Sequence, residues 1–282
     1  EKRGDPRSAI ETYERLLEID LDDPSPLDSL EALHTMVGDW RGLVDVLQRK
    51  TQRAFDPAER GELLRRAGSV LEELLQDRAG AVEAYRAALL EDEMDDIALE
   101  ALDRLYTTAG DHEQLGDVLQ RRLDIEQDPE LRVDLALRLG REYEEHLRRP
   151  EEAIDAYRRV LDDAPEHSDA ALALARLYER QRMWPELLEN LRMQAAVQED
   201  PQLRVQLLYR AGEVLEREMD DVLTALPTYE EVLQLDTHFE PAIDALLRIS
   251  KLEDYRVQAS EIVEPLLRTQ ERWDELAELL EG

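Results

Sequence analysis

Residues of the same type recur every 72 positions along this chain. Four independent series share this period: Asp56-Pro57, Asp128-Pro129 and Asp200-Pro201; Tyr13, Tyr85, Tyr157 and Tyr229; Gly68, Gly140 and Gly212; and Leu33, Leu105, Leu177 and Ile249. Chance does not give four series one period, so the chain is an array of repeats. Such repeats bury their apolar faces against their neighbours rather than in one large core.

The repeat over residues 56–127 predicts four helices. Asp56 and Pro57 are typical of a helix start, because the carboxylate caps free N–H groups and proline needs no N–H there. Apolar residues at helical spacing continue this helix through Leu74 and predict three more at about 79–91, 95–109 and 112–127. The loops between these helices are only about two to four residues long, and such short loops force neighbouring helices to run antiparallel.

The whole chain, residues 1–282, is expected to be a single repeat array. We divide it into a partial repeat, three repeats and an off-register terminal helix pair, at residues 1–55, 56–127, 128–199, 200–252 and 253–282. The fold class is therefore all-α, a right-handed superhelical solenoid of about 13 helices. Pro227 lies in a predicted helix, and we expect it in the first turn, where a missing N–H costs little.

The spacing within a repeat, about 34 and then 38 residues, resembles that of the tetratricopeptide repeat, a helical hairpin of 34 residues. The matching residues are Gly140 with Ala153, Tyr157 and Pro165; Gly68 with Ala81, Tyr85 and Ala88; and the turns Gly38-Asp39-Trp40 and Gly110-Asp111. The step from Gly68 to Ala81 is one residue longer than in the family, so this is a divergent double repeat. The resemblance implies a bacterial-type array whose first helices line a concave binding groove.

Two arginine series and one glutamate series fall on these first helices, and they are our candidate peptide-binding residues: Arg66, Arg138 and Arg210; Arg104, Arg176 and Arg248; Glu72, Glu144 and Glu216. Guanidinium forks grip carboxylates through two hydrogen bonds. Resemblance to peptide-clamping members of the family implies an acidic or C-terminal peptide ligand. The alternative is a ladder of Arg–Glu pairs that only holds helix against helix, and the sequence leaves both open.

Composition excludes several function classes. The formal net charge is −33, from 35 Lys+Arg and 68 Asp+Glu, which disfavours nucleic acid and anionic membranes as partners. No apolar run is long enough to insert into a membrane. The absence of cysteine excludes disulfides without fixing the compartment, and a cytoplasmic location is favoured.

No catalytic, cofactor-binding or metal-binding residues are expected. No two of the five histidines lie four residues apart, so no pair of histidines on one helix is available for a metal, and no phosphate loop or nucleophile motif occurs. Trp40, Trp184 and Trp273 are interpreted as packing residues between hairpins.

The sequence therefore predicts a non-enzymatic scaffold that binds a partner peptide or protein through its concave groove. Two alternatives stay open: a structural array that associates end to end with other copies, and a regulatory or recruiting segment of a larger multidomain protein.

Overall fold

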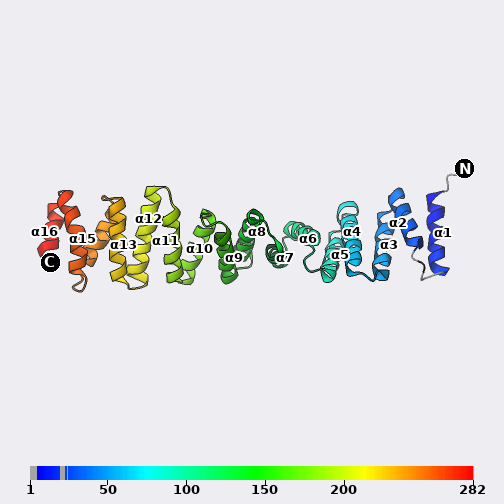
Figure 1. Cartoon of the computed structure of the whole chain (residues 1–282), viewed down its shortest axis with the longest axis horizontal. Helices are drawn as coiled ribbons and strands as arrows, with labels where there is room; N and C mark the ends of the chain where they lie inside the picture. Colours follow the sequence, from blue (N-terminus) through cyan, green and yellow to red (C-terminus); the bar gives the residue numbers. More distant parts are fainter. Residues whose placement is uncertain (1–4, 20–22, 24, 282) are drawn as a thin grey trace. The chain divides into compact units, whose positions relative to one another are not determined.

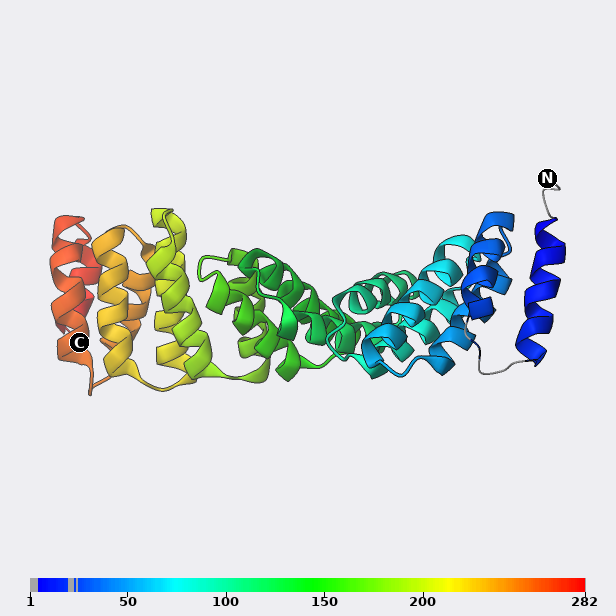
Figure 2. The same cartoon turned by 45° about the vertical axis from the view of Figure 1, so that its right-hand side comes forward.

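The computed structural model describes residues 5–19, 23 and 25–281, which form helices, turns and loops without any strand. The chain divides into two compact halves, Glu1–Arg149 and Pro150–Gly282. Within each half, helices that follow one another in sequence pack side by side as antiparallel pairs (Figures 1 and 2). The all-α class and the repeated arrangement expected from the sequence are confirmed.

The N-terminal half contains eight α-helices and two short π-helical segments among its described residues. They are α1 (Pro6–Ile19), α2 (Ser25–Val37), α3 (Trp40–Arg53), α4 (Pro57–Ser69), η1 (Val70–Leu74), α5 (Arg78–Glu91), α6 (Asp96–Ala109), α7 (His112–Ile125), α8 (Pro129–Arg141) and η2 (Glu142–His146).

The C-terminal half repeats this order. Its described elements are α9 (Pro150–Asp163), α10 (Ser168–Gln181), α11 (Trp184–Val197), α12 (Pro201–Glu213), η3 (Val214–Glu218), α13 (Val222–Leu235), α14 (Glu240–Ile249), α15 (Arg256–Thr269) and α16 (Trp273–Glu281). The described residues thus hold 16 α-helices rather than about 13, distributed as three, four, four, three and two over the five segments into which the sequence was divided.

The 72-residue period sets where helices begin. Helices α4, α8, α12 and α16 start at residues 57, 129, 201 and 273. The capping role expected for Asp56 is confirmed, since its side chain accepts a hydrogen bond from the N–H of Ala58 at 3.2 Å. Asp128 and Asp200 cap α8 and α12 in the same way, so a short local signal defines the start of each of these helices.

Each π-helical segment accommodates the one extra residue by which the step from Gly68 to Ala81, and its counterparts, exceeds the spacing of the tetratricopeptide repeat. In η1 the N–H of Leu75 donates to the carbonyl of Val70 at 3.1 Å, and in η3 the N–H of Met219 donates to Val214 at 3.0 Å. These bonds span five residues instead of four, so each segment absorbs one extra residue while the backbone stays hydrogen-bonded. The chain then leaves the helix through a left-handed residue, Gln76 or Asp220.

Glycine is required where a first helix crosses the helix that follows it. A Cβ on Gly212 would lie 2.5 Å from the ring of Tyr229, and one on Gly68 would lie 2.9 Å from the ring of Tyr85. Tyr229 is fully buried, so its ring has no room to move aside. Gly68 with Tyr85 and Gly212 with Tyr229, two members of each series in the sequence, are therefore two sides of one contact.

The position expected for Pro227 is wrong: it lies inside α13, past the first turn, and its pyrrolidine ring therefore deprives a helical carbonyl of its usual donor. The off-register interpretation of residues 253–282 rested on side-chain identity, whereas α15 and α16 begin 72 residues after α11 and α12. Helix boundaries keep the period there because they depend on helix and loop length, which change less than the packed side chains.

Candidate functional site

The first helices of successive hairpins form one face in each half, which we call the first-helix face: α2, α4, α6 and α8 in the N-terminal half, and α10, α12 and α14 in the C-terminal half. Ion pairs link neighbouring helices across it. Arg104 on α6 grips Glu72 of η1 through Nε and Nη2, at 3.0 and 2.9 Å. Arg248 on α14 grips Glu216 of η3 in the same way, at 2.8–3.1 Å.

The other arginine series is paired as well. Arg66 binds Glu31 of α2, and Arg210 binds Glu179 of α10. Arg138 on α8 places both terminal nitrogens on Asp103 of α6, at 3.0 and 2.6 Å.

The remaining two candidates, Arg176 and Glu144, also have interaction partners. The structure thus places seven of the nine candidate residues in ion pairs between successive first helices, and ligand binding by all nine stays a prediction.

Asp103 is the most enclosed carboxylate of this set. Its side chain is 6% exposed and is held by Arg122 from α7 as well as by Arg138. Burial disfavours the charged form, but the hydrogen bonds and positive charge of the two arginines outweigh it and lower the pKa of Asp103. This carboxylate therefore stays ionised and fastens three helices together.

Buried tyrosines support the glutamates. The hydroxyl of Tyr85 donates to Glu72 at 3.3 Å, and that of Tyr229 donates to Glu216 at 2.8 Å. Burial, together with the neighbouring Glu72 carboxylate, raises the pKa of Tyr85 to about 12. Burial and Glu216 likewise raise the pKa of Tyr229. Each tyrosine stays protonated and fixes the carboxylate that in turn fixes an arginine.

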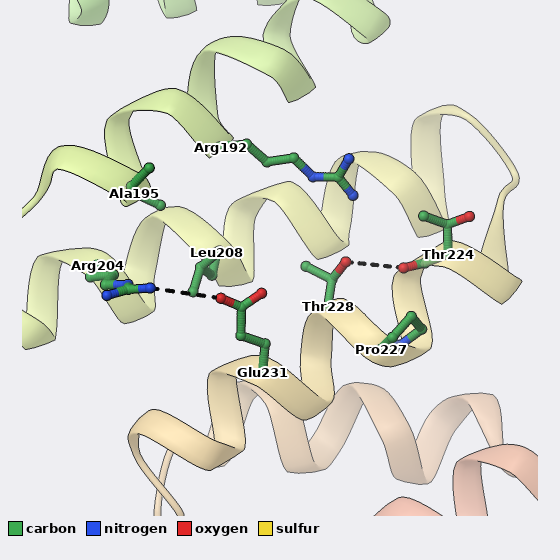
Figure 3. Close-up of a pocket in the computed structure, with 9 residues that line it drawn as sticks. Arg192, Ala195, Arg204, Leu208, Thr224, Pro227, Thr228 and Glu231 are labelled. Carbon is green, nitrogen blue, oxygen red and sulfur yellow. Dashed lines mark hydrogen bonds and ion pairs between the residues drawn. The ribbon is translucent and has the colours of Figure 1, made fainter.

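A pocket of about 420 Å³ opens between α11, α12 and α13 of the C-terminal half. Figure 3 shows Arg204 facing Glu231 across it, with 3.9 Å between Nη2 and Oε1, and Thr228 donating to the carbonyl of Thr224. Pro227 lines the same pocket. Sequence reasoning missed this pocket, although a proline within a helical pattern was a signal for an irregular packing site.

A second feature missed by sequence reasoning lies in the N-terminal half. His112 at the start of α7 meets Glu142 and His146 of η2, and ligand-type atoms of the three lie within 4.8 Å of one another. The sequence was examined for two histidines four residues apart on one helix, and this cluster does not fit that pattern because His112 and His146 lie on different helices. The signal was the four-residue step from Glu142 to His146.

No described helix combines the length and apolar character needed to cross a bilayer. Stacked antiparallel hairpins with capped starts and a Gly–Tyr contact define an α-helical repeat protein. Family models of the tetratricopeptide repeat match residues 1–27 and 98–133 in one case and residues 134–167 in another. The residues that these models match are tetratricopeptide repeats, and a fold of such repeats supports a role as a protein-interaction scaffold.

Three solved structures are among those similar to this chain. YrrB, described as a TPR protein with an unusual peptide-binding site, is 15% identical over 84% of this chain and 98% of its own, with a TM-score of 0.36. The C-terminal part of a repeat protein from Cytophaga hutchinsonii is 17% identical over 85% of this chain and 93% of its own, with a TM-score of 0.36. MamA is 17% identical over 70% and 94%, with a TM-score of 0.35.

Comparison of the sequence with curated proteins gives no match.

Proposed function

We propose that the chain is a non-enzymatic scaffold that binds peptide segments of a partner protein along the first-helix face of each half. Arg104 in the N-terminal half and Arg248 in the C-terminal half would each grip a carboxylate of the segment bound to its own half. The observation that carries this proposal is the geometry of these two arginines. Each is fixed through its Nε–Nη2 edge to a carboxylate that a buried tyrosine holds in turn.

The rest of each guanidinium faces outward. The side chains of Arg104 and Arg248 are 55% and 46% exposed. Within the part of the chain that the structure describes, the Nη1 atom of neither arginine has a hydrogen-bond partner. A guanidinium fork keeps donors on its remaining edge after it binds one carboxylate. A fork held in place in this way loses little conformational entropy when a second carboxylate binds, so it favours affinity.

The test is a binding measurement with acidic, basic and neutral peptides on the whole chain and on the R104Q/R248Q variant. We expect acidic or C-terminal peptides to bind and the variant to weaken them at least about tenfold, the loss of about 1.4 kcal/mol expected for a charged hydrogen bond. Retained binding by R104Q/R248Q, or binding of basic peptides alone, would contradict the proposal.

R41Q/R121Q is the matched control, since both arginines are exposed on second helices and their loss changes the net charge equally. A melting temperature of R104Q/R248Q that falls while peptide binding is unchanged would show that these arginines serve only as a ladder between helices.

A further inference from the structure

The second helix of a hairpin contacts the π-helical segment that follows it three times among the described residues, and the side chains at this contact differ in kind. Helices α3, α7 and α11 contact η1, η2 and η3 respectively. The first contact carries Trp40, Val70 and Leu74, and the third carries Trp184, Val214 and Glu218. At the same three positions the middle contact carries His112, Glu142 and His146.

The apolar version of this contact needs no polar group. Trp40 and Val70 both pack against the core cluster of Leu43, Leu47, Leu63 and Ala67. In the middle copy, the residues at all three positions are metal-ligand types. Replacement of one of the three residues by a polar residue would be enough to make this contact solvated. Replacement of all three by metal-ligand types therefore points to a role beyond solvation.

The three side chains are already close. Nδ1 of His112 lies 2.8 Å from Oε2 of Glu142, and the rings of His112 and His146 stack with centroids 3.8 Å apart and planes inclined by 7°. Glu142 is mostly enclosed, at 17% exposed, while His112 is 37% exposed and His146 is exposed. The cluster thus has a fixed carboxylate and two imidazoles that solvent reaches.

We propose that His112, Glu142 and His146 bind one divalent transition-metal ion of the Zn²⁺ class. Two imidazole nitrogens and one carboxylate oxygen suit this class better than Ca²⁺ or Mg²⁺, which prefer oxygen alone. Metal–nitrogen distances of about 2.1 Å bring donor atoms to roughly 3.4 Å apart in a tetrahedral site. The 2.8 Å pair of His112 and Glu142 therefore opens by about 0.6 Å, while the donor atoms that now lie up to 4.8 Å apart move closer together.

Binding requires one imidazole to leave the stack, because the in-plane lone pairs of parallel rings do not converge on one point. The exposed His146 is the ring that turns, and water completes the coordination shell. The ion takes the place of the hydrogen bond between His112 and Glu142. It ties α7 to η2 and thereby stiffens the junction between two hairpins of the N-terminal half.

The experiment titrates the whole chain with ZnCl₂ by calorimetry and with CoCl₂ by visible absorption. We expect one equivalent of Zn²⁺, a Co²⁺ spectrum with nitrogen ligands, and a higher melting temperature with Zn²⁺, since binding to the folded state alone stabilises it. H146A removes an exposed ligand and should weaken binding at least tenfold and abolish the melting shift.

H112W/E142V/H146L is a second variant that installs the residues of the first contact, so it keeps a packing solution the chain already uses. It should remain folded and bind no Zn²⁺ at this site. H238A is the control for other histidines and should bind as the wild type does. Absence of saturable binding, or equal Zn²⁺ affinity in the wild type and H146A, would overturn the proposal whether or not the triple variant folds.

Discussion

The two halves of the chain solve the same packing problem with different chemistry. In the N-terminal half, Asp103 lies between Arg122 and Arg138, and the same arrangement occurs 72 residues earlier with Glu31 between Lys50 and Arg66. In the C-terminal half, the position that matches Asp103 is Ala175.

The partners of this position also differ in the C-terminal half. Gln194 stands in place of Arg122 and donates to the buried Asn190 at 2.5 Å, while Arg210 turns to Glu179 on the next turn of α10. The difference teaches that a buried carboxylate is kept only with its full set of cations. Removing one charge without the others leaves an unpaired group in a low-dielectric site.

The largest effect is expected from D103A in the N-terminal half. It leaves Arg122 and Arg138 without their shared carboxylate, and breaking such an enclosed set costs about 3 kcal/mol. Urea unfolding measures the loss, and hydrogen exchange should locate it in α6, α7 and α8. A loss below about 0.5 kcal/mol, the range of ordinary surface substitutions, would contradict the comparison.

D103A/R122Q brings two residues of the C-terminal arrangement, those at Ala175 and Gln194, to the matching positions of the N-terminal half. It should recover part of the stability that D103A loses, because only one cation then remains without the carboxylate. If the double variant is less stable than D103A, the two halves are not interchangeable at this position.

A smaller effect is expected from the Gly–Tyr contact, and it should be stronger in the C-terminal half. G212A places a Cβ against the fully buried Tyr229, and such overpacking costs about 2 kcal/mol. G68A meets Tyr85 at a longer distance and should cost less. Chemical denaturation of both variants tests the order.

G110A is the control, because Gly110 has a φ of 69° and no atom within 4 Å of an added Cβ, so only backbone strain of about 1 kcal/mol is expected. In the C-terminal half Arg182 occupies the matching position at a φ of 58°, so this strain is tolerated. A larger loss in G68A than in G212A would show that ring contact does not set the cost.

The smallest effect concerns alkaline pH. Tyr85 has a pKa of about 12 in the fold against an ordinary 10.0, so its contribution is present below pH 10 and is lost as pH rises toward 12. The loss should reach about 1 kcal/mol at pH 11, and Y85F should not show it, since phenylalanine has no proton to lose. Urea unfolding of both chains at pH 9 and pH 11 gives the comparison.

The same measurement on Y229F extends the comparison to the C-terminal half, where the tyrosine hydroxyl lies closer to its glutamate. An equal loss of stability between pH 9 and pH 11 in the wild type, Y85F and Y229F would assign the alkaline effect to other groups.

Much of the fold was predictable because it depends on local signals. Asp56 followed by Pro57 marks a helix start in any context, and apolar residues at helical spacing mark the buried face. The position of Pro227 was predicted wrongly, although the period itself puts the start of α13 at Val222, 72 residues after α9 begins at Pro150. The expectation rested instead on the rule that proline is tolerated in the first turn of a helix.

The candidate site was predictable only in part. The period placed Arg104, Glu72 and their counterparts on the first helices, but the sequence could not decide between ligand binding and ion pairing. The His112 cluster was missed because its members come from two helices about 30 residues apart.

By itself, the sequence determined the repeat, the helix boundaries and the residues that recur on each face, since these follow from spacing along one chain. The tertiary structure decided which recurring residues meet. It paired Arg104 with Glu72 and brought His112 to Glu142. It also turned an extra residue into a π-helical segment. Such contacts depend on how one helix packs against another, which has no record in the local spacing of residues.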